Sequence, residues 1–359
     1  MSVLNLVENM REMRDELEAH ALRINREEIE EEDSGNNKKV KTYLIESNIP
    51  KPISDELFKV SDTKDANLKM LQSRDSNKFL FYADTSDNRF WQLHTAEPAQ
   101  PSYKILKKYI LKNNSHLDFS WFYSNFLEDE CSIGTTKGFN IRFKDIFNEI
   151  QEEIDNNVPN IEKFSMLFWG GKASEVITAL RTTALSEGIS LSAILTKYYI
   201  DNSYSKEKIQ SYGKFTLTKT NSIDSHLTAV NKISKRYSKH IEKIESGNKI
   251  VTKIENNRLK IEGNFASIQL KKEIQNIELF IKTIFSGKAP FRLFGMPQKI
   301  DDNYYKIFAI DLHTTSKFDI EILPNELRIY LDEAACGNVI PRLLTNLQSN
   351  FSSELNYVL

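Results

Sequence analysis

Residues 214–262 read KFTLTKTNSIDSHLTAVNKISKRYSKHIEKIESGNKIVTKIENNRLKIE, and the fold prediction rests mainly on this segment. Residues 214–219 are typical of a strand, and residues 249–262 alternate apolar and polar side chains around an Asn256-Asn257 turn, which predicts a hairpin. Between them, apolar residues recur every three or four positions, as on one face of a helix. These residues are Ile223, Leu227, Val230, Ile233, Tyr237, Ile241 and Ile244. The stretch therefore predicts a strand, a long helix and a hairpin in direct succession.

The rest of the chain also mixes both kinds of element. Runs typical of strands occupy residues 78–83, 89–94, 139–143, 164–169, 193–200, 304–310, 318–322 and 327–331. Helical periodicity is found over residues 3–24, 102–110, 173–186 and 267–286, and from residue 339 onward. We therefore predict an α+β fold with mixed or antiparallel sheets, packed helices and an N-terminal helical arm.

The chain divides into four predicted segments. Residues 1–34 form an acidic arm with an amphipathic helix, residues 35–41 a linker, and residues 42–158 and 159–359 two α+β domains, the second with the basic helix and hairpin. The helix of the arm can pack on its own body, pair with a partner or a second copy, or lie on a membrane. Its acidic polar face disfavours an anionic membrane. We expect a protein partner or self-association through residues 3–24, and no membrane.

The net charge of −2 over 359 residues conceals an uneven distribution. Residues 1–34 hold 4 Arg and 11 acidic residues, a net charge of −7. Residues 197–288 hold 18 basic and 9 acidic residues, a net charge of +9. Because electrostatic fields act within about 8–10 Å in physiological salt, the local charges matter more than the total. The middle segment is therefore a candidate for binding polyanions.

A row of lysines on the predicted helix carries this charge. Lys232, Lys235, Lys239 and Lys243 step by three and four positions and lie off the apolar stripe. Such a row can neutralise several phosphates of a nucleic acid. The alternatives are docking onto an acidic protein surface or onto the acidic arm, and an ordinary solvated face. The predicted nucleic-acid-binding residues, including the hairpin, are Lys232, Lys235, Arg236, Lys239, Lys243, Lys253 and Arg258.

Two possible phosphate or anion sites have simpler interpretations. Residues 170–172, Gly-Gly-Lys, lie between a predicted strand and helix, but a phosphate-binding loop needs a glycine at the position of Met166 and Ser or Thr after the lysine. A strand–helix turn explains them without a ligand. The turn at residues 336–338, with Arg342 one turn into the next helix, can hold an anion, or it is a plain helix cap.

Asp311 and His313 support an alternative enzyme hypothesis. Both can lie on one face of a strand, with Asp319 and Glu321 nearby, as in a metal-dependent nuclease or nucleotide-acting enzyme. One Asp-x-His pair supplies only two of the three protein ligands that a catalytic zinc needs. A solvated strand end is the competing interpretation. We expect no catalytic residue, no metal and no cofactor.

The absence of a complete catalytic motif favours a non-enzymatic protein. We predict a subunit of an intracellular, prokaryotic multi-protein complex, of the genome-processing or phage-defence type, that binds a protein partner and DNA or RNA through the basic helix. A homo-oligomeric structural protein is a further alternative. The chain shows no signal peptide and no apolar run of membrane-spanning length, so we expect a soluble, cytoplasmic protein.

Overall fold

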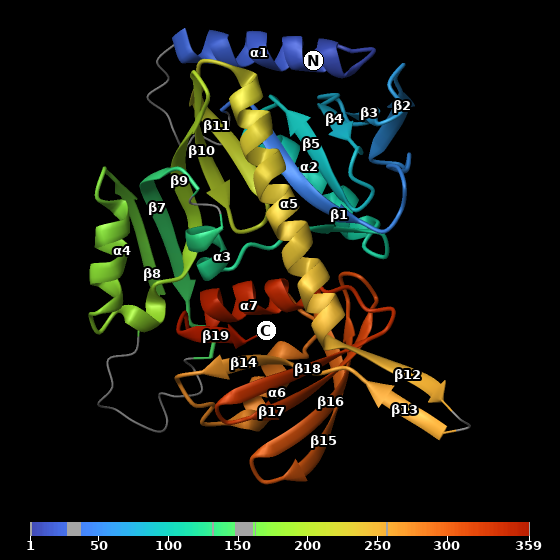
Figure 1. The fold of residues 1–359 in the computed structure, drawn as a ribbon, viewed down its shortest axis with the longest axis vertical. Helices are drawn as coiled ribbons and strands as arrows, with labels where there is room; N and C mark the ends of the chain where they lie inside the picture. The colour runs from blue at the N-terminus through green and yellow to red at the C-terminus, as the bar shows by residue number, and fades with distance from the viewer. Residues whose placement is uncertain are drawn as a thin grey trace. The chain divides into compact units, whose positions relative to one another are not determined.

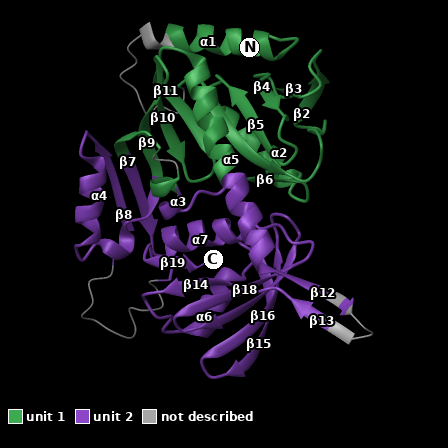
Figure 2. Ribbon diagram, viewed as in Figure 1, with its two compact units in different colours: residues 1–120, 127–138, 193–236 green, residues 121–126, 139–192, 237–359 purple. Residues whose placement is uncertain are grey.

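The computed structural model describes residues 2–26, 37–130, 133–147, 161, 163–255 and 258–358. Its helices and mostly antiparallel sheets confirm the predicted α+β class. The chain divides into two compact units (Figure 2). Unit 1 comprises residues 1–120, 127–138 and 193–236, and unit 2 comprises residues 121–126, 139–192 and 237–359. Each unit thus draws on both predicted domains, 42–158 and 159–359.

Unit 1 is built on an antiparallel sheet with the strand order β2-β3-β4-β5-β1-β11-β10-β9, and β6 pairs with β1 (Figure 1). The strands are β1 (Lys41–Ser47), β2 (Phe58–Asp62), β3 (Leu68–Ser73), β4 (Leu80–Asp84), β5 (Phe90–Thr95), β6 (Leu117–Phe119), β9 (Leu191–Ile200), β10 (Ser203–Gln210) and β11 (Lys214–Thr220). The hairpin predicted over residues 78–94 is confirmed as β4 and β5. Lys41, the last residue of the predicted linker, begins β1.

Two helices pack on opposite faces of this sheet. Thr42 of β1 hydrogen-bonds to His226 of α5 (Ile223–Asn248), whereas the ring of Tyr43 stacks on Tyr103 of α2 (Ala99–Lys112), with centroids 6.1 Å apart. Consecutive strand residues point to opposite faces, so α5 and α2 lie on different sides. Helix α2 begins earlier than the predicted Ser102, because Pro101 fits the first helical turn, where no backbone donor is needed.

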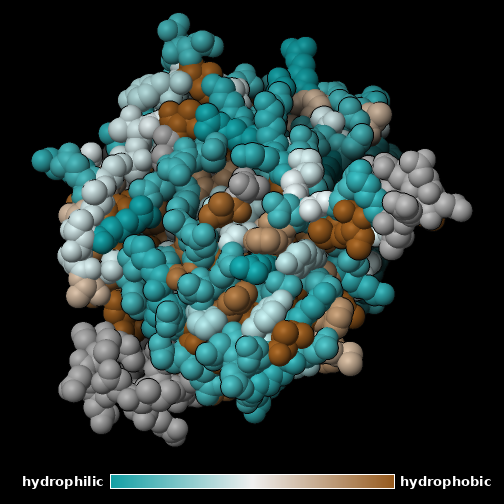
Figure 3. All heavy atoms as spheres, turned by 60° about the horizontal axis from the view of Figure 1, so that its bottom comes forward, coloured by the Kyte–Doolittle hydropathy of each residue, from teal (hydrophilic) through white to brown (hydrophobic). Residues whose placement is uncertain are grey.

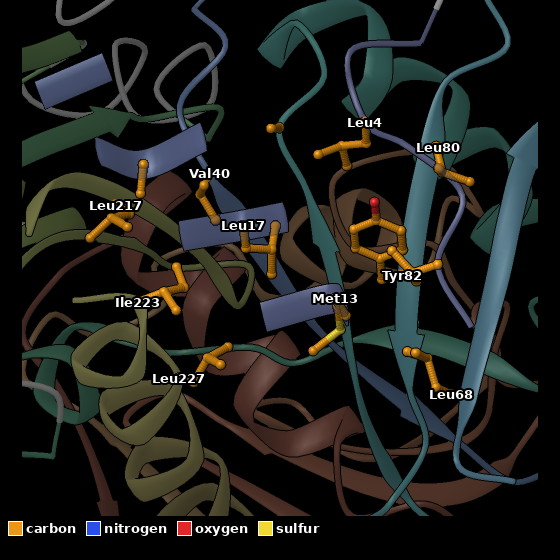
Figure 4. Packing of buried hydrophobic residues seen from close by; sticks show 13 residues of the cluster. Leu4, Met13, Leu17, Val40, Leu68, Leu80, Tyr82, Leu217, Ile223 and Leu227 are labelled. Carbon is orange, nitrogen blue, oxygen red and sulfur yellow. The ribbon is translucent and has the colours of Figure 1, made fainter. Parts of the chain in front are cut away.

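Helix α1 (Met10–Arg26) packs on unit 1 through its apolar stripe (Figure 4). Met13, Leu17 and Ala21 are buried in one cluster with residues of β11 and the first turns of α5. Of the three predicted positions for the arm, packing on its own body is the one found. A partner or second copy on residues 3–24 stays a prediction.

Unit 2 contains a second sheet, with the order β13-β12-β18-β17-β16-β15 and with β14 between β18 and β19. All its pairs are antiparallel except β12 with β18, which is parallel. Its strands are β12 (Lys249–Glu255), β13 (Arg258–Glu262), β14 (Ala266–Leu270), β15 (Leu293–Asp301), β16 (Tyr304–Asp311), β17 (Lys317–Leu323), β18 (Glu326–Asp332) and β19 (Leu355–Val358). The two strands of the predicted hairpin at 249–262 and the three predicted C-terminal strands are thereby confirmed, and the predicted Asn256-Asn257 turn lies outside the described residues.

The remaining elements complete both units. The predicted strand at 164–169 is confirmed as β8, and the helix predicted over 173–186 is confirmed as α4, which ends earlier, at Arg181. Strands β7 and β9 and helices α3 and α5 have residues in both units. The further elements are α3 (Ser124–Asp129), β7 (Thr135–Lys144), β8 (Lys163–Trp169), α4 (Ala173–Arg181), a short 3-10 helix (Ser186–Gly188), α6 (Ile277–Ile284) and α7 (Val339–Asn350). Among the described residues, no helix is long and apolar enough to cross a membrane.

The helix predicted over residues 267–286 is wrong in its first half. Residues 266–270 form strand β14, which is paired on both sides, with β18 and with β19. These pairings satisfy the backbone of β14 and bury Ile268, so tertiary contacts override the helical spacing. The helix begins only after Asn276, whose side chain accepts a hydrogen bond from the Leu279 amide at 3.1 Å.

Candidate nucleic-acid interface

Helix α5 has the predicted apolar stripe, and the stripe is buried. All seven of its apolar residues, from Ile223 to Ile244, are at most 7% exposed. Glu18 of α1 accepts a hydrogen bond from the Ile223 amide, which places a carboxylate at the positive end of the helix dipole. Arg14 lies 4.0 Å from Asp224 in the same turn. The described part of the acidic arm therefore contacts the start of α5, a little more than two turns before the lysine row.

The lysine row, Lys232, Lys235, Lys239 and Lys243, is exposed along α5. Within the described part of the chain, none of the four forms an ion pair with a carboxylate. At about 1.5 Å per residue, the row is about 16 Å long. Arg236, the fifth predicted binding residue, differs, because its guanidinium lies 2.9 Å from a Glu130 carboxylate oxygen. Among the described residues, four of the five predicted helical cations thus have no carboxylate partner.

A buried polar network joins α5 to the sheet beneath it. Nδ1 of His226 lies 2.9 and 3.0 Å from the two carboxylate oxygens of Glu207, and because a carboxylate only accepts, this nitrogen donates. Nε2 of the same ring lies 2.7 Å from the hydroxyl of Thr42, which is also 2.8 Å from Nδ1 of His94. Sequence reasoning missed this network, because strands β1, β5 and β10 and helix α5 each contribute one residue to it.

The order carboxylate, imidazole and hydroxyl is the order found in catalytic triads. Here, however, Thr42, His94, Glu207 and His226 are all buried, with at most 1% of any of them exposed. Burial, and next the neighbouring His226, lowers the pKa of His94 to about 3. A substrate could not reach the Thr42 hydroxyl in this arrangement. We therefore assign the network a structural role, which is to hold α5 on the sheet.

The two hairpin residues of the predicted interface cannot be placed. Lys253 lies on β12 and Arg258 on β13, but their side chains are outside the described residues. The neighbouring lysines of the hairpin lie near acidic residues. Nζ of Lys249 is 3.9 Å from Glu245, and Nζ of Lys260 is 2.7 Å from Glu262. Of the predicted binding residues, only those on α5 therefore have side chains that the structure describes.

Asp311 and His313 lie together in unit 2, where Arg342 joins them. Nδ1 of His313 is 3.3 Å from Asp311, the Thr314 hydroxyl donates to the same carboxylate at 2.7 Å, and Arg342 forms an ion pair with it. Burial alone would raise the pKa of Asp311, but the charge of Arg342 and hydrogen bonds from His313 and Arg342 outweigh it and lower that pKa. Because the carboxylate and the guanidinium are fully buried, they neutralise each other inside the unit.

The acidic residues of the alternative enzyme site are not brought together. Asp311 lies on the buried face of the second sheet, whereas Asp319 and Glu321 lie on its other face. Asp319 pairs with Lys306 at 3.2 Å, and Glu321 accepts from the Tyr330 hydroxyl at 3.1 Å. Within the described ranges, no group of three or more His, Cys, Asp or Glu residues could hold a metal ion.

The remaining predicted anion sites have ordinary partners. Lys172 precedes α4 and lies 3.6 Å from Glu175, with both side chains exposed. At the start of α7, the Asn338 side chain accepts a hydrogen bond from the Tyr237 hydroxyl and does not cap its own helix. The Gly337 amide donates to Glu245 at 2.8 Å, so a carboxylate of the protein occupies the predicted anion position in this turn.

Comparison with known proteins identifies a family. The Methanocaldococcus jannaschii protein named "Uncharacterized protein MJECL33" is 27% identical to this chain over an alignment of 358 residues. The alignment covers 88% of this chain and 85% of the relative. No solved structure shows a significant match to the chain. The family described as "MJECL33-like protein" matches residues 1–358. Because this match spans nearly the whole sequence, the chain belongs to the MJECL33-like protein family.

Proposed function

We propose that this protein is a non-enzymatic, nucleic-acid-binding subunit of a multi-protein complex, and that it contacts the phosphate backbone through the lysine row of α5. One observation carries the proposal: four exposed lysines lie in one row above a buried stripe, and in the described part of the chain no carboxylate pairs with them. Phosphate contacts of this kind supply affinity with no dependence on base sequence.

The arrangement of α5 favours a rigid binding surface. The His226–Glu207 contact and the buried stripe hold one side of the helix, which leaves the lysines on the other side. Their long side chains can then adjust to phosphates without movement of the backbone. The acidic arm does not compete for the row within the described residues, since its polar contacts with α5 are with Ile223 and Asp224.

Exposed apolar residues on β15 and β16 support the subunit part of the proposal. Phe294 pairs with Ile310 and Met296 with Phe308, on the face of the sheet that the core does not cover. These four side chains are between 36% and 69% exposed. Figure 3 shows apolar residues exposed among hydrophilic ones on the surface turned toward the viewer. Contiguous apolar surface of this kind is typical of protein interfaces.

The proposal is tested by the binding of a fluorescent 20-base-pair duplex to the full chain between 50 and 300 mM salt. We expect the triple variant Lys232→Glu, Lys235→Glu and Lys239→Glu to weaken binding at least about tenfold and to reduce the salt slope by about 3, since each lysine releases about one counterion. Lys59→Glu, an exposed lysine of β2, is the matched control. No binding at 50 mM salt, or equal affinity of the triple variant and the control, contradicts the proposal.

A further inference from the structure

Three lysines form a second row, on unit 1, that crosses neighbouring strands. Lys197 of β9 lies opposite Lys206 of β10, and Lys206 lies opposite Lys219 of β11. Adjacent strands are about 4.8 Å apart, so the row spans about 10 Å at the backbone. None of the three lysines forms an ion pair with a carboxylate of the described chain.

This row faces away from α5. Glu207, the next residue after Lys206, points toward α5, where it contacts His226. Because alternate residues of a strand point to opposite faces, Lys206 points to the other side of the sheet. A β-bulge follows Lys206 in the pairing with β11, and its extra residue is Thr218, whose hydroxyl donates to the Lys206 carbonyl at 3.0 Å. Without the bulge, Lys219 would turn to the α5 face.

Two tyrosines lie within the row. Tyr199 and Tyr204 are directly paired across β9 and β10. Nζ of Lys197 lies 4.5 Å from the ring centroid of Tyr199 and 4.3 Å from that of Tyr204. Tyr199 is 65% exposed, which is more than Phe294 or Phe308 on the second sheet. Lys197 lies over this ring, and the large exposed fraction of Tyr199 leaves ring surface on which a ligand can stack.

The electrostatic environment of Tyr199 is positive. A hydrogen bond with Lys197 lowers the pKa of the Tyr199 hydroxyl, and the charges of Lys197, Lys137 and Lys206 lower it further. All these cations belong to the same unit as the tyrosine. An anionic group placed beside the ring would experience the same attraction.

We propose that the face of β9, β10 and β11 that carries Lys197, Tyr199, Tyr204, Lys206 and Lys219 binds single-stranded nucleic acid. The lysines contact successive phosphates, and the exposed Tyr199 ring stacks on an unpaired base. A duplex hides its bases within the helical stack, so an aromatic platform among cations favours a single strand. This site is separate from the lysine row of α5, because it lies on the opposite face of the sheet. The two binding proposals can therefore be tested, and contradicted, independently.

The test uses the full chain with fluorescent 12-nucleotide oligo(dT) and oligo(U), and with the duplex used for α5. Base stacking on an aromatic ring is worth about 1–3 kcal/mol, so we expect Tyr199→Ala to weaken single-strand binding about 5- to 100-fold. Tyr199→Phe, which keeps the ring, should stay within about twofold of the unchanged chain. Neither variant should alter duplex binding. The oligo(dT) and oligo(U) arms show which sugar is preferred.

Two further variants address the lysines. Lys206→Glu with Lys219→Glu should reduce the salt slope of single-strand binding by about 1 to 2, whereas Lys59→Glu should not. Thermal melts check that each variant is folded. Equal single-strand affinity of Tyr199→Ala and the unchanged chain overturns the inference, and so does competition by poly-glutamate as strong as that by oligo(dT). Loss of duplex binding in the α5 variant bears only on the proposed function.

Discussion

The two lysine rows present similar chemistry in two different ways. The row on α5 comes from twelve consecutive residues, 232–243, whereas the row on the sheet comes from three strands. A helix brings residues three and four apart onto one face, so the lysine row of α5 can be recognised in the sequence from the spacing of its lysines. A sheet row depends on the register between strands, and here also on the bulge at Thr218. The α5 row can therefore be predicted from local spacing, whereas the row on β9, β10 and β11 depends on how the strands are paired.

The largest expected effect is a difference in stability between substitutions on the two faces of the unit 1 sheet. Replacement Glu207→Leu removes the acceptor of the buried His226 donor, and we expect it to lower the free energy of unfolding by about 3 kcal/mol. Lys206 is the neighbouring residue, on the face of the sheet that points away from α5 (the open face). Lys206→Ala should change the free energy of unfolding by less than about 0.5 kcal/mol. Urea unfolding followed by circular dichroism measures both. Equal losses of unfolding free energy in the two variants would contradict the assignment of a structural role to the buried network alone.

A second prediction concerns pH. The pKa of His94 in the folded chain is about 3, below its ordinary value of 6.5. The unfolded chain therefore binds a proton that the folded chain does not as the pH falls below 6.5. We expect the free energy of unfolding to decrease toward pH 3 by up to about 1.4 kcal/mol per pH unit from this residue.

The control for the pH prediction isolates His94. Burial, and next the charge of Lys243, also lowers the pKa of His240, to about 4, so the unchanged chain has more than one such histidine. His94→Gln should reduce the pH dependence, which urea unfolding at pH 7, 6 and 5 measures. A variant with the same pH dependence as the unchanged chain would exclude His94 as a source.

A smaller effect is expected on the open face. The hydrogen bond and charge of Lys197 lower the pKa of Tyr199, so Lys197→Met should move the ionisation of this tyrosine to higher pH. Difference absorbance near 295 nm between the two chains reports the shift. Lys232→Met, on α5, is the control and should leave the titration unchanged. A shift of equal size in the control would show that the local environment of Tyr199 is not responsible.

The smallest effect is expected from Arg236 of α5, which pairs with Glu130. Arg236 and Glu130 are each more than 40% exposed, so solvent screens their ion pair. A double-mutant cycle with Arg236→Ala and Glu130→Ala should give a coupling of about 0.2–1 kcal/mol. A coupling above about 2 kcal/mol would mean that this ion pair holds α5 in place, as the buried network does.

Much of the fold could be predicted because its patterns are local. The apolar spacing of α5, the turn between β4 and β5 and the alternation of β16 to β18 each lie within a short segment, and the structure confirms them. The helix predicted at 267–286 failed where pairing with two other strands decided the outcome. The network around His226 could not be predicted, because its four residues lie far apart in the sequence.

The α+β class, the α5 helix and the spacing of its lysines can be predicted from the sequence, because they depend on periodicity within single elements. It also contained Asp311, His313 and Arg342 as separate candidates. Tertiary packing brings these three residues into one buried cluster and places Asp319 and Glu321 on the other face of the sheet. Only the tertiary structure also placed Lys197, Lys206 and Lys219 in a row, since the register between strands depends on packing across the whole sheet.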